Sequence, residues 1–78
     1  MTTREQIYQL ASDILGVPEA SLRPDAPFAL YAVDSLDIVE FVFAVQEQFH
    51  VHFESAEFEG LKTLDDLIAA VNSKLNPV

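Results

Sequence analysis

Two stretches of this sequence repeat apolar residues at the spacing of an α-helix, and this periodicity restricts the possible folds most. The stretches are residues 3–15 and 64–75, where apolar side chains recur three and four positions apart, as they do on one face of a helix. The positions are Ile7, Leu10, Ala11, Ile14 and Leu15 in the first stretch, and Leu64, Leu67, Ile68, Val71 and Leu75 in the second. No segment of useful length alternates apolar and polar residues as a strand would. The pattern therefore predicts an all-α protein.

Residues with strong preferences for helix ends bound both stretches. Thr3, followed three positions later by Gln6, matches a capping box at the start of the first helix. Gly16 follows the last apolar residue of that helix and provides a stop signal. For the second helix we expect Thr63 at the N-cap and Pro77 just beyond the C-terminal end. Both helices are therefore expected to run for about three and a half turns.

Residues 35–49 are predicted to form a third main helix. Asp34 is expected at its N-cap and Asp37 lies in its first turn, where carboxylates interact favourably with the positive end of the helix dipole. One or two further helical turns fit within residues 55–60. The fold class is thus a small four-helix bundle, with three main helices and one short helix, in a single domain over residues 1–78.

The segment 16–33 is predicted to be mainly loop. It contains three of the four prolines, Pro18, Pro24 and Pro27, and prolines interrupt regular structure. The segment also contains apolar residues, namely Val17, Leu22, Phe28 and Leu30. These residues indicate a loop strapped across a core, not a free linker.

A strongly acidic composition restricts the possible partners. Thirteen Asp and Glu against four Lys and Arg give a net charge of −9. This balance disfavours binding to nucleic acid and to anionic membrane surfaces, both of which require clustered basic residues. Half of the residues are apolar, so the chain is also not a disordered acidic tail. We expect a folded domain in the cytoplasm, because neither a signal peptide nor a membrane span is evident, and partners with basic patches.

The helix predicted for residues 35–49 has two different apolar faces when it is drawn at about 100° per residue. One face is the expected buried stripe, formed by Ile38, Val39, Val42, Val45 and Phe49. The other combines two large apolar residues with two carboxylates, namely Leu36, Glu40, Phe43 and Glu47. This second face is either an exposed binding strip with an acidic rim or a widening of the core contact. The pattern alone does not decide between these alternatives.

Ser35 opens the same helix directly after a loop, so its hydroxyl is expected to be accessible. A phosphodiester attached there would lie next to the free N–H groups and the positive end of the helix dipole. Equally, serine is common in the first turn of helices for purely structural reasons. The neighbouring residues favour the functional interpretation.

The run Asp34-Ser35-Leu36-Asp37 resembles the Asp-Ser-Leu signature of acyl carrier proteins. The resemblance continues through Ile38-Val39-Glu40-Phe41-Val42-Phe43-Ala44-Val45-Gln46-Glu47-Gln48-Phe49, with the family's aliphatic stripe, its Glu and its closing Phe. The order of helices and proline-bearing loop also agrees with the family, so the similarity spans nearly the whole chain.

The resemblance implies a non-catalytic carrier protein, and a monomer is expected. Ser35 would carry 4′-phosphopantetheine, transferred from coenzyme A by a phosphopantetheinyl transferase (holo-acyl-carrier-protein synthase). Asp34 would be the second residue of this cofactor-binding site. Acyl groups would be held on the arm as thioesters and delivered to fatty-acid or polyketide-type enzymes, such as a ketosynthase or an acyltransferase. The expected docking residues are Leu36, Asp37, Glu40, Phe43 and Glu47. The chain contains no Cys, so the sulfur of any thioester belongs to the cofactor.

Several positions depart from the family pattern. Tyr31 and Ala32 stand where the family often has Leu-Gly, and His50 stands where a Gly or Asp commonly follows the closing Phe. Because His tolerates the left-handed region better than most residues, a helix cap at His50 is still expected. Glu54 and Ser55 replace the usual Pro and Asp, and a Phe occupies position 43 in place of an aliphatic residue. These changes favour a carrier of a specialised pathway.

Two other interpretations of the residues compete with this one. The first is an acidic helical interaction module that binds a basic partner through Leu36 and Phe43 without any cofactor. The second concerns His50 and His52, which could form a ligand pair. No third ligand is evident, so we expect both to be solvent-facing residues at a helix end and expect no metal site.

Overall fold

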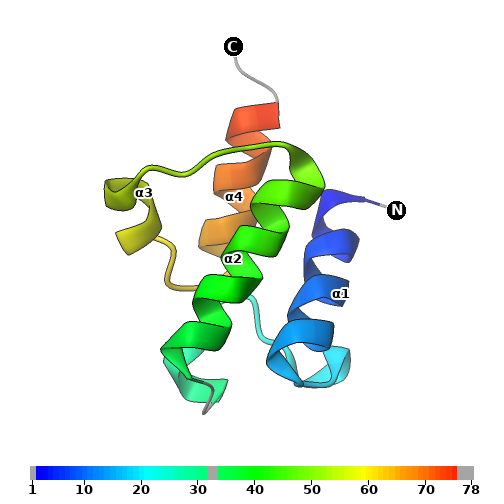
Figure 1. Ribbon diagram of the computed structural model, residues 1–78. Helices are drawn as coiled ribbons and strands as arrows, with labels where there is room; N and C mark the ends of the chain where they lie inside the picture. The colour runs from blue at the N-terminus through cyan, green and yellow to red at the C-terminus, as the bar shows by residue number, and fades with distance from the viewer. Residues whose placement is uncertain (1, 32–33, 76–78) are drawn as a thin grey trace.

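The computed structural model describes residues 2–31 and 34–75 as a bundle of helices (Figure 1). The elements in chain order are α1 (Thr3–Leu15), η1 (Glu19–Ser21), η2 (Phe28–Tyr31), α2 (Ser35–Phe49), α3 (Ser55–Glu59) and α4 (Leu64–Leu75), where η marks a short 3₁₀ helix. The all-α fold and the bounds of the three main helices are confirmed. Within the described ranges, β-pairing is limited to one isolated bridge between Pro27 and Thr63.

The three main helices lie side by side, and their directions place the two ends of the molecule. α1 runs antiparallel to α2, whereas α4 runs in the direction of α2 (Figure 1). The short α3 lies to one side of α2. In this arrangement α2 begins at one end of the bundle, at Ser35, and α4 finishes at the opposite end, at Leu75.

The N-cap of α1 is Thr2 rather than the expected Thr3. The Thr2 hydroxyl accepts a hydrogen bond from the Glu5 backbone N–H at 3.1 Å, and the Glu5 carboxylate accepts one from the Thr2 N–H at 3.1 Å. Both Thr-x-x-Glu and Thr-x-x-Gln fit the capping-box pattern. The carboxylate prevails because a charged acceptor forms the stronger hydrogen bond and also interacts with the helix dipole.

The other predicted helix ends agree with the structure. Gly16 ends α1 in the left-handed conformation, at φ 72°, and His50 ends α2 in the same way, at φ 56°. At the start of α4 the Thr63 hydroxyl accepts a hydrogen bond from the Asp66 N–H at 3.0 Å, and Asp66 accepts one from the Thr63 N–H at 3.2 Å. Pro77, expected to terminate this helix, lies outside the described residues, as does Ala32.

The core lies between the three main helices. It contains Phe41, which was not among the residues predicted for the buried stripe of α2. Phe41 is fully buried, and its ring meets that of Phe28 edge-on at 6.0 Å between centroids. Val39, expected in the buried stripe, is not part of the core cluster. The buried face of α2 is therefore rotated towards Phe41, because Phe28 of η2 packs against that side of the helix. The buried core residues are Ile7, Ala11, Leu15, Leu22, Phe28, Phe41, Val42, Val45, Phe53, Leu64, Leu67, Ile68 and Val71.

The long loop before α2 is strapped across the core, as expected, but only three of its four apolar residues face the core. Leu22 and Phe28 are buried and Val17 packs against the core, but Leu30 is exposed. Two backbone hydrogen bonds tie the loop to α4 and the segment before it. They run from the Phe28 N–H to the Lys62 carbonyl (2.9 Å) and from the Asp65 N–H, in the first turn of α4, to the Pro24 carbonyl (3.0 Å).

Candidate functional site

Ser35 is an exposed residue at the first position of α2, at one end of the bundle. Asp34 precedes it at the N-cap position with extended backbone angles, φ −70° and ψ 150°. The Asp34 side chain makes no capping hydrogen bond. Its backbone carbonyl starts the helix instead, accepting from the Asp37 N–H at 3.0 Å and the Ile38 N–H at 3.3 Å. The Asp34 carboxylate is therefore not used to stabilise the helix end.

The start of α2 suits a phosphodiester on Ser35. The first N–H groups of a helix have no carbonyl one turn earlier to bind, and together with the helix dipole they favour a negative group nearby. Because Ser35 is exposed, its hydroxyl can be reached by a second protein and the attached group has room outside the bundle. The residues present thus fit a phosphorylated arm, which would supply the thiol that the Cys-free chain lacks.

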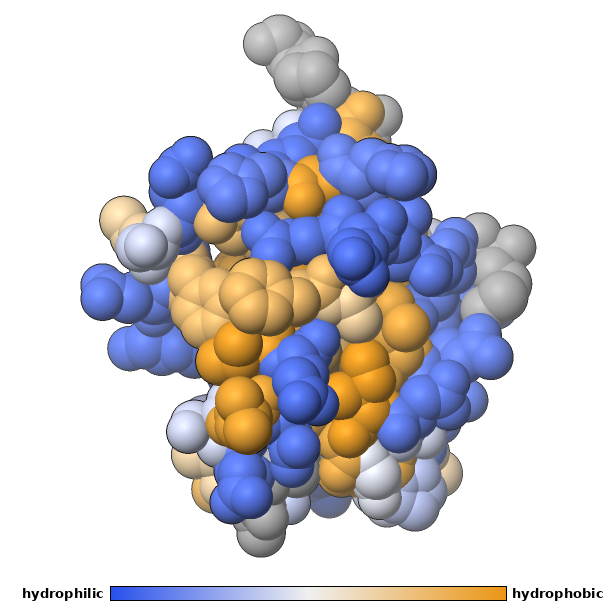
Figure 2. All heavy atoms as spheres, viewed as in Figure 1, coloured by the Kyte–Doolittle hydropathy of each residue, from blue (hydrophilic) through white to orange (hydrophobic). Residues whose placement is uncertain are grey.

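The second apolar face of α2 is exposed, which rules out the wider core contact. Leu36 is 66% exposed and Phe43 is 57% exposed. Glu40 and Glu47 are also exposed, and Asp37 is half-buried. Figure 2 shows apolar side chains gathered over the middle of this face of the molecule with hydrophilic ones around and between them. We call the residues Leu36, Asp37, Glu40, Phe43 and Glu47 the α2 strip.

Hollows in the surface adjoin the α2 strip. Two of them share the Phe43 ring as a wall. One, of about 280 Å³, lies towards Val51 and His52, and the other, of about 340 Å³, lies towards Phe53 and Phe58. A third hollow of about 280 Å³ lies beside the first turns of α2. Its lining is mainly apolar and consists of Pro27, Phe28, Ala29, Ile38, Leu61 and Lys62. These hollows could not be predicted from the sequence, because they depend on how α2, α3 and the loops pack together.

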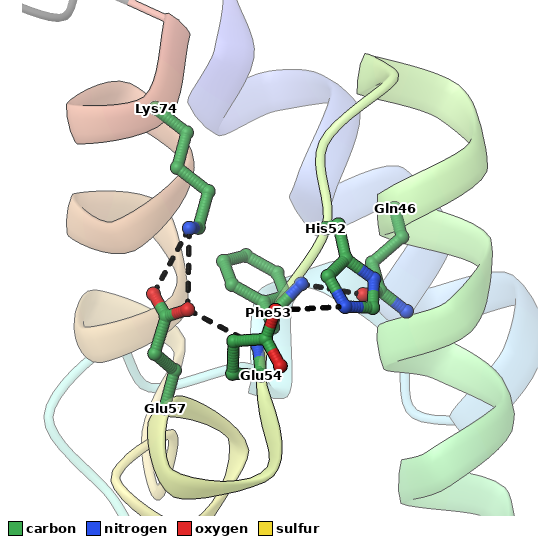
Figure 3. A network of polar contacts seen from close by, with 6 residues as sticks. All are labelled: Gln46, His52, Phe53, Glu54, Glu57 and Lys74. Atoms are coloured by element: carbon green, nitrogen blue, oxygen red, sulfur yellow. Dashed lines mark hydrogen bonds and ion pairs between the residues drawn. The ribbon is translucent and has the colours of Figure 1, made fainter.

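A network of polar contacts holds α3 against α2 and α4 (Figure 3). The Gln46 side chain accepts a hydrogen bond from the Phe53 N–H at 2.7 Å. Lys74 of α4 pairs with Glu57 of α3, at 3.0 Å to Oε2 and 3.3 Å to Oε1. The backbone N–H of Glu54 and then the Lys74 ammonium donate to Glu57 and hold the pKa of its carboxyl below the ordinary value of 4.5. These contacts position the wall of the hollow beside Phe43, and sequence reasoning missed them.

Both histidines are exposed, as expected, and His52 lies near one carboxylate. His52 Nε2 lies 3.4 Å from Glu54 Oε1, with both side chains 76% exposed. Over the described ranges, no three His, Cys, Asp or Glu side chains are grouped so that they could hold a metal ion. A search of the same residues also finds no helix long and apolar enough to cross a membrane.

Comparison with known proteins defines the class of this protein. The family model for a phosphopantetheine attachment site matches residues 5–71. This range includes Ser35, the whole of α2 and α3, and most of α1 and α4. The fold and this match define a phosphopantetheine-binding carrier domain.

Full-length relatives define the family more closely. The chain is 36% identical to the acyl carrier protein of Thermosynechococcus vestitus, over 91% of this chain and 89% of that protein. It is 31% identical to the acyl carrier protein of Solidesulfovibrio magneticus, over 95% and 96%, and 29% identical to that of Nitratidesulfovibrio vulgaris, over 95% and 99%. The chain therefore belongs to the acyl carrier protein family. It is a non-catalytic carrier, and its attachment site implies a covalent 4′-phosphopantetheine, unlike the cofactor-free interaction module considered above.

Proposed function

We propose that this protein carries acyl groups as thioesters on a 4′-phosphopantetheine attached to Ser35, and presents them to fatty-acid or polyketide-type enzymes of a specialised pathway. The observation that supports Ser35 best is its exposed position at the start of α2, between Asp34 and Leu36 and within the matched region. In the transfer, Ser35 Oγ bonds to the phosphorus of the phosphopantetheine in coenzyme A, adenosine 3′,5′-bisphosphate leaves, and the hydroxyl proton passes to a base of the transferase.

The residues around Ser35 have separate roles in this proposal. The first-turn N–H groups of α2 and its dipole stabilise the negative phosphodiester. The Asp34 carboxylate carries the same charge as the phosphodiester, so it does not bind the arm. Because it also makes no capping hydrogen bond, it faces outward and is available to cationic groups of the transferase.

The α2 strip is proposed as the docking surface for enzymes that act on the arm. Leu36 and Phe43 are large apolar side chains that a partner can bury, and burial of such anchors contributes most to binding. Asp37, Glu40 and Glu47 are carboxylates next to these anchors, so they attract and orient partners with basic patches. We propose that the phosphopantetheinyl transferase, ketosynthases and acyltransferases all approach this strip.

Intact-mass measurement tests the attachment site. Incubation with coenzyme A and a broad-specificity phosphopantetheinyl transferase should add the mass of one phosphopantetheine to the natural chain and nothing to Ser35→Ala. Ser55→Ala is the matched control, because Ser55 is also an exposed serine that opens a helix after an acidic residue, and it should be modified as the natural chain is. A mass gain that persists in Ser35→Ala would place the arm elsewhere.

A further inference from the structure

Leu30 is the most exposed large apolar side chain in the part of the chain that the structure describes, at 71%, ahead of Leu36 and Phe43. A single exposed leucine is common on protein surfaces and needs no explanation of its own. Leu30 differs because the turn that displays it is fastened on both sides, so its exposure is built into the fold.

The fastening involves the residues that flank Leu30 in η2. On one side, the Phe28 ring is buried against Phe41, and the Phe28 N–H donates to the Lys62 carbonyl at 2.9 Å. On the other side, the Tyr31 hydroxyl accepts from the Arg23 N–H at 2.7 Å and donates to the Arg23 carbonyl at 2.9 Å. A side chain on a backbone that is already ordered loses less conformational entropy when a partner buries it.

Leu30 also lies close to Ser35. Four residues lie between them, which limits the distance between their Cα atoms to about 18 Å for a fully extended chain. The actual separation is shorter, because Ala29 and Ile38 line one hollow and η2 therefore packs beside the first turns of α2. A protein interface of ordinary size covers about 800 Å² of each partner, which corresponds to a disc with a radius of about 16 Å. η2 lies at the end of the bundle where α2 begins (Figure 1), so an interface of this size that is centred on Ser35 can reach Leu30.

We propose that Leu30 is an apolar anchor for the enzyme that transfers phosphopantetheine to Ser35. Leu30 precedes Ser35 in the chain and Leu36 follows it, so the enzyme would contact an apolar side chain on each side of the serine. This inference rests on the proposed attachment at Ser35. The matching surface of the enzyme is an apolar depression beside its active site with a basic rim, because the carboxylates of Asp34 and Asp37 flank the approach. Tyr31 acts as a positioning residue that holds the turn.

Steady-state kinetics of transfer from coenzyme A by a broad-specificity phosphopantetheinyl transferase test the proposal. Leu30→Ala removes most of the apolar area that this one side chain would contribute to the interface, so kcat/KM for the carrier should fall about tenfold, mainly through KM. The melting temperature should not change, because the side chain is exposed. Leu30→Met should restore most of the activity. Leu75→Ala is the matched control, since Leu75 is also exposed but lies at the opposite end of the bundle, and it should leave kcat/KM unchanged.

Tyr31→Phe separates positioning from simple structural support. It removes both hydrogen bonds to Arg23 while keeping the ring, so amide exchange in η2 should accelerate and kcat/KM should fall about threefold. If a folded Leu30→Ala protein had the same kcat/KM as the natural chain, the inference about Leu30 would be overturned. The proposed modification of Ser35 would not be affected by that result. Faster exchange in Tyr31→Phe without any change in kcat/KM would likewise show that the display of Leu30 has no role. Failure of the proposed function itself is distinguished by a natural chain that gains no mass or by a Ser35→Ala protein that does.

Discussion

Asp34 occupies the N-cap of α2 without capping it through its side chain, whereas Thr2 and Thr63 accept the hydrogen bonds that their positions allow. An Asp in this position normally accepts a hydrogen bond from a first-turn N–H. At the start of α2 the Asp37 N–H donates to the Asp34 carbonyl instead, and no capping side chain covers the helix end beside Ser35. This difference between residues of the same nominal role is consistent with a helix end that is kept for a ligand, not used only for stability.

Charge reversal within the α2 strip should slow the enzymes that dock there. Glu40→Lys with Glu47→Lys replaces two exposed carboxylates beside Phe43, so basic partners are repelled and the rate of acyl or phosphopantetheine transfer should fall at least about tenfold at low salt. The loss should shrink at high salt, because exposed charges are then screened. The measurement is kcat/KM against ionic strength with a cognate enzyme.

The control for this reversal is Asp13→Lys with Glu19→Lys, which changes net charge equally at exposed residues of α1 and η1. It should slow transfer much less. Equal effects of the two double reversals would mean that net charge, and not the α2 strip, sets the rate of association.

The role of a single residue was predictable from the sequence where a local pattern determines it. It was not predictable where it depends on which other element packs nearby. The left-handed cap at His50 followed from the preferences of its side chain, and the flanking residues of Ser35 led to the attachment site that we propose. The exposure of Leu36 and Phe43 was not decidable, because helical angle says which residues share a face but not whether another element covers it. The cap of α1 was assigned one residue late, since Thr2 and Thr3 both fit the pattern.

Among the elements, α3 depends most on contacts outside itself. It has five residues and none of them is buried, and so short a helix is not stable alone in water. Phe58 packs partly against the core, and Lys74 joins α3 to α4 through Glu57. Lys74 also lies 5.5 Å from the centre of the Phe53 ring. Lys74 of α4 therefore contacts both α3 and the segment just before it.

Removing this link should loosen α3 selectively. Lys74→Gln keeps most of the side-chain length but loses the charge, so amide exchange in residues 54–60 should accelerate about two- to fivefold while the core amides of α1 and α2 change little. Hydrogen exchange followed by mass spectrometry or NMR measures this. Arg4→Gln, which breaks the exposed Arg4–Asp65 pair (3.7 Å), should leave α3 unaffected.

Acid should have the same effect as the substitution. The pKa of Glu57 is lowered in the folded protein by the Glu54 N–H and by Lys74, so the contribution of this group is complete above its ordinary value of 4.5 and is lost as pH falls through the folded pKa. Protection of α3 should therefore decrease in acid, and less so in Lys74→Gln. Protection of α3 that is unchanged in both experiments, relative to the intrinsic exchange rate at each pH, would show that apolar contact alone holds α3.

The elements differed in how far the sequence could define them. α1, α2 and α4 have amphipathic periods and clear end signals, and their bounds were predicted correctly. The turns η1 and η2 lie in a proline-rich loop without such a period. Leu30 was wrongly grouped with the buried loop residues, because apolar composition does not reveal that Phe28 and Tyr31 fasten the turn and direct Leu30 outward.

Across the whole molecule, negative charge is largely uncompensated. The net charge is −9, and the ion pairs found in the described residues join Arg4 to Asp65, Lys74 to Glu57 and His52 to Glu54. Charges of one sign on a small domain repel and disfavour the compact state. The overall class and the acidity followed from the sequence, whereas the distribution of the paired and unpaired carboxylates required the structure.

Salt should therefore stabilise the fold. Raising ionic strength from very low to about 0.15 M shortens the Debye length to about 8 Å, so the melting temperature should rise by several degrees, and a divalent cation should act at lower concentration. Thermal melts followed by circular dichroism measure this. Glu40→Gln with Glu47→Gln has two fewer negative charges and should respond less. A melting temperature that is flat or falls over this range would mean that self-repulsion does not limit stability.

The directions of the helices also determine how this protein can be tethered. Ser35 lies at one pole of the bundle and the end of α4, at Leu75, lies at the other (Figure 1), in a molecule whose longest dimension is 35 Å. A flexible tether that joins Leu75 to a surface or to a larger assembly would therefore be attached at the pole opposite Ser35. The pole that holds the proposed attachment site can then swing around that tether and meet several enzymes in turn, while the body of the domain acts as a rigid spacer between the anchor and this site.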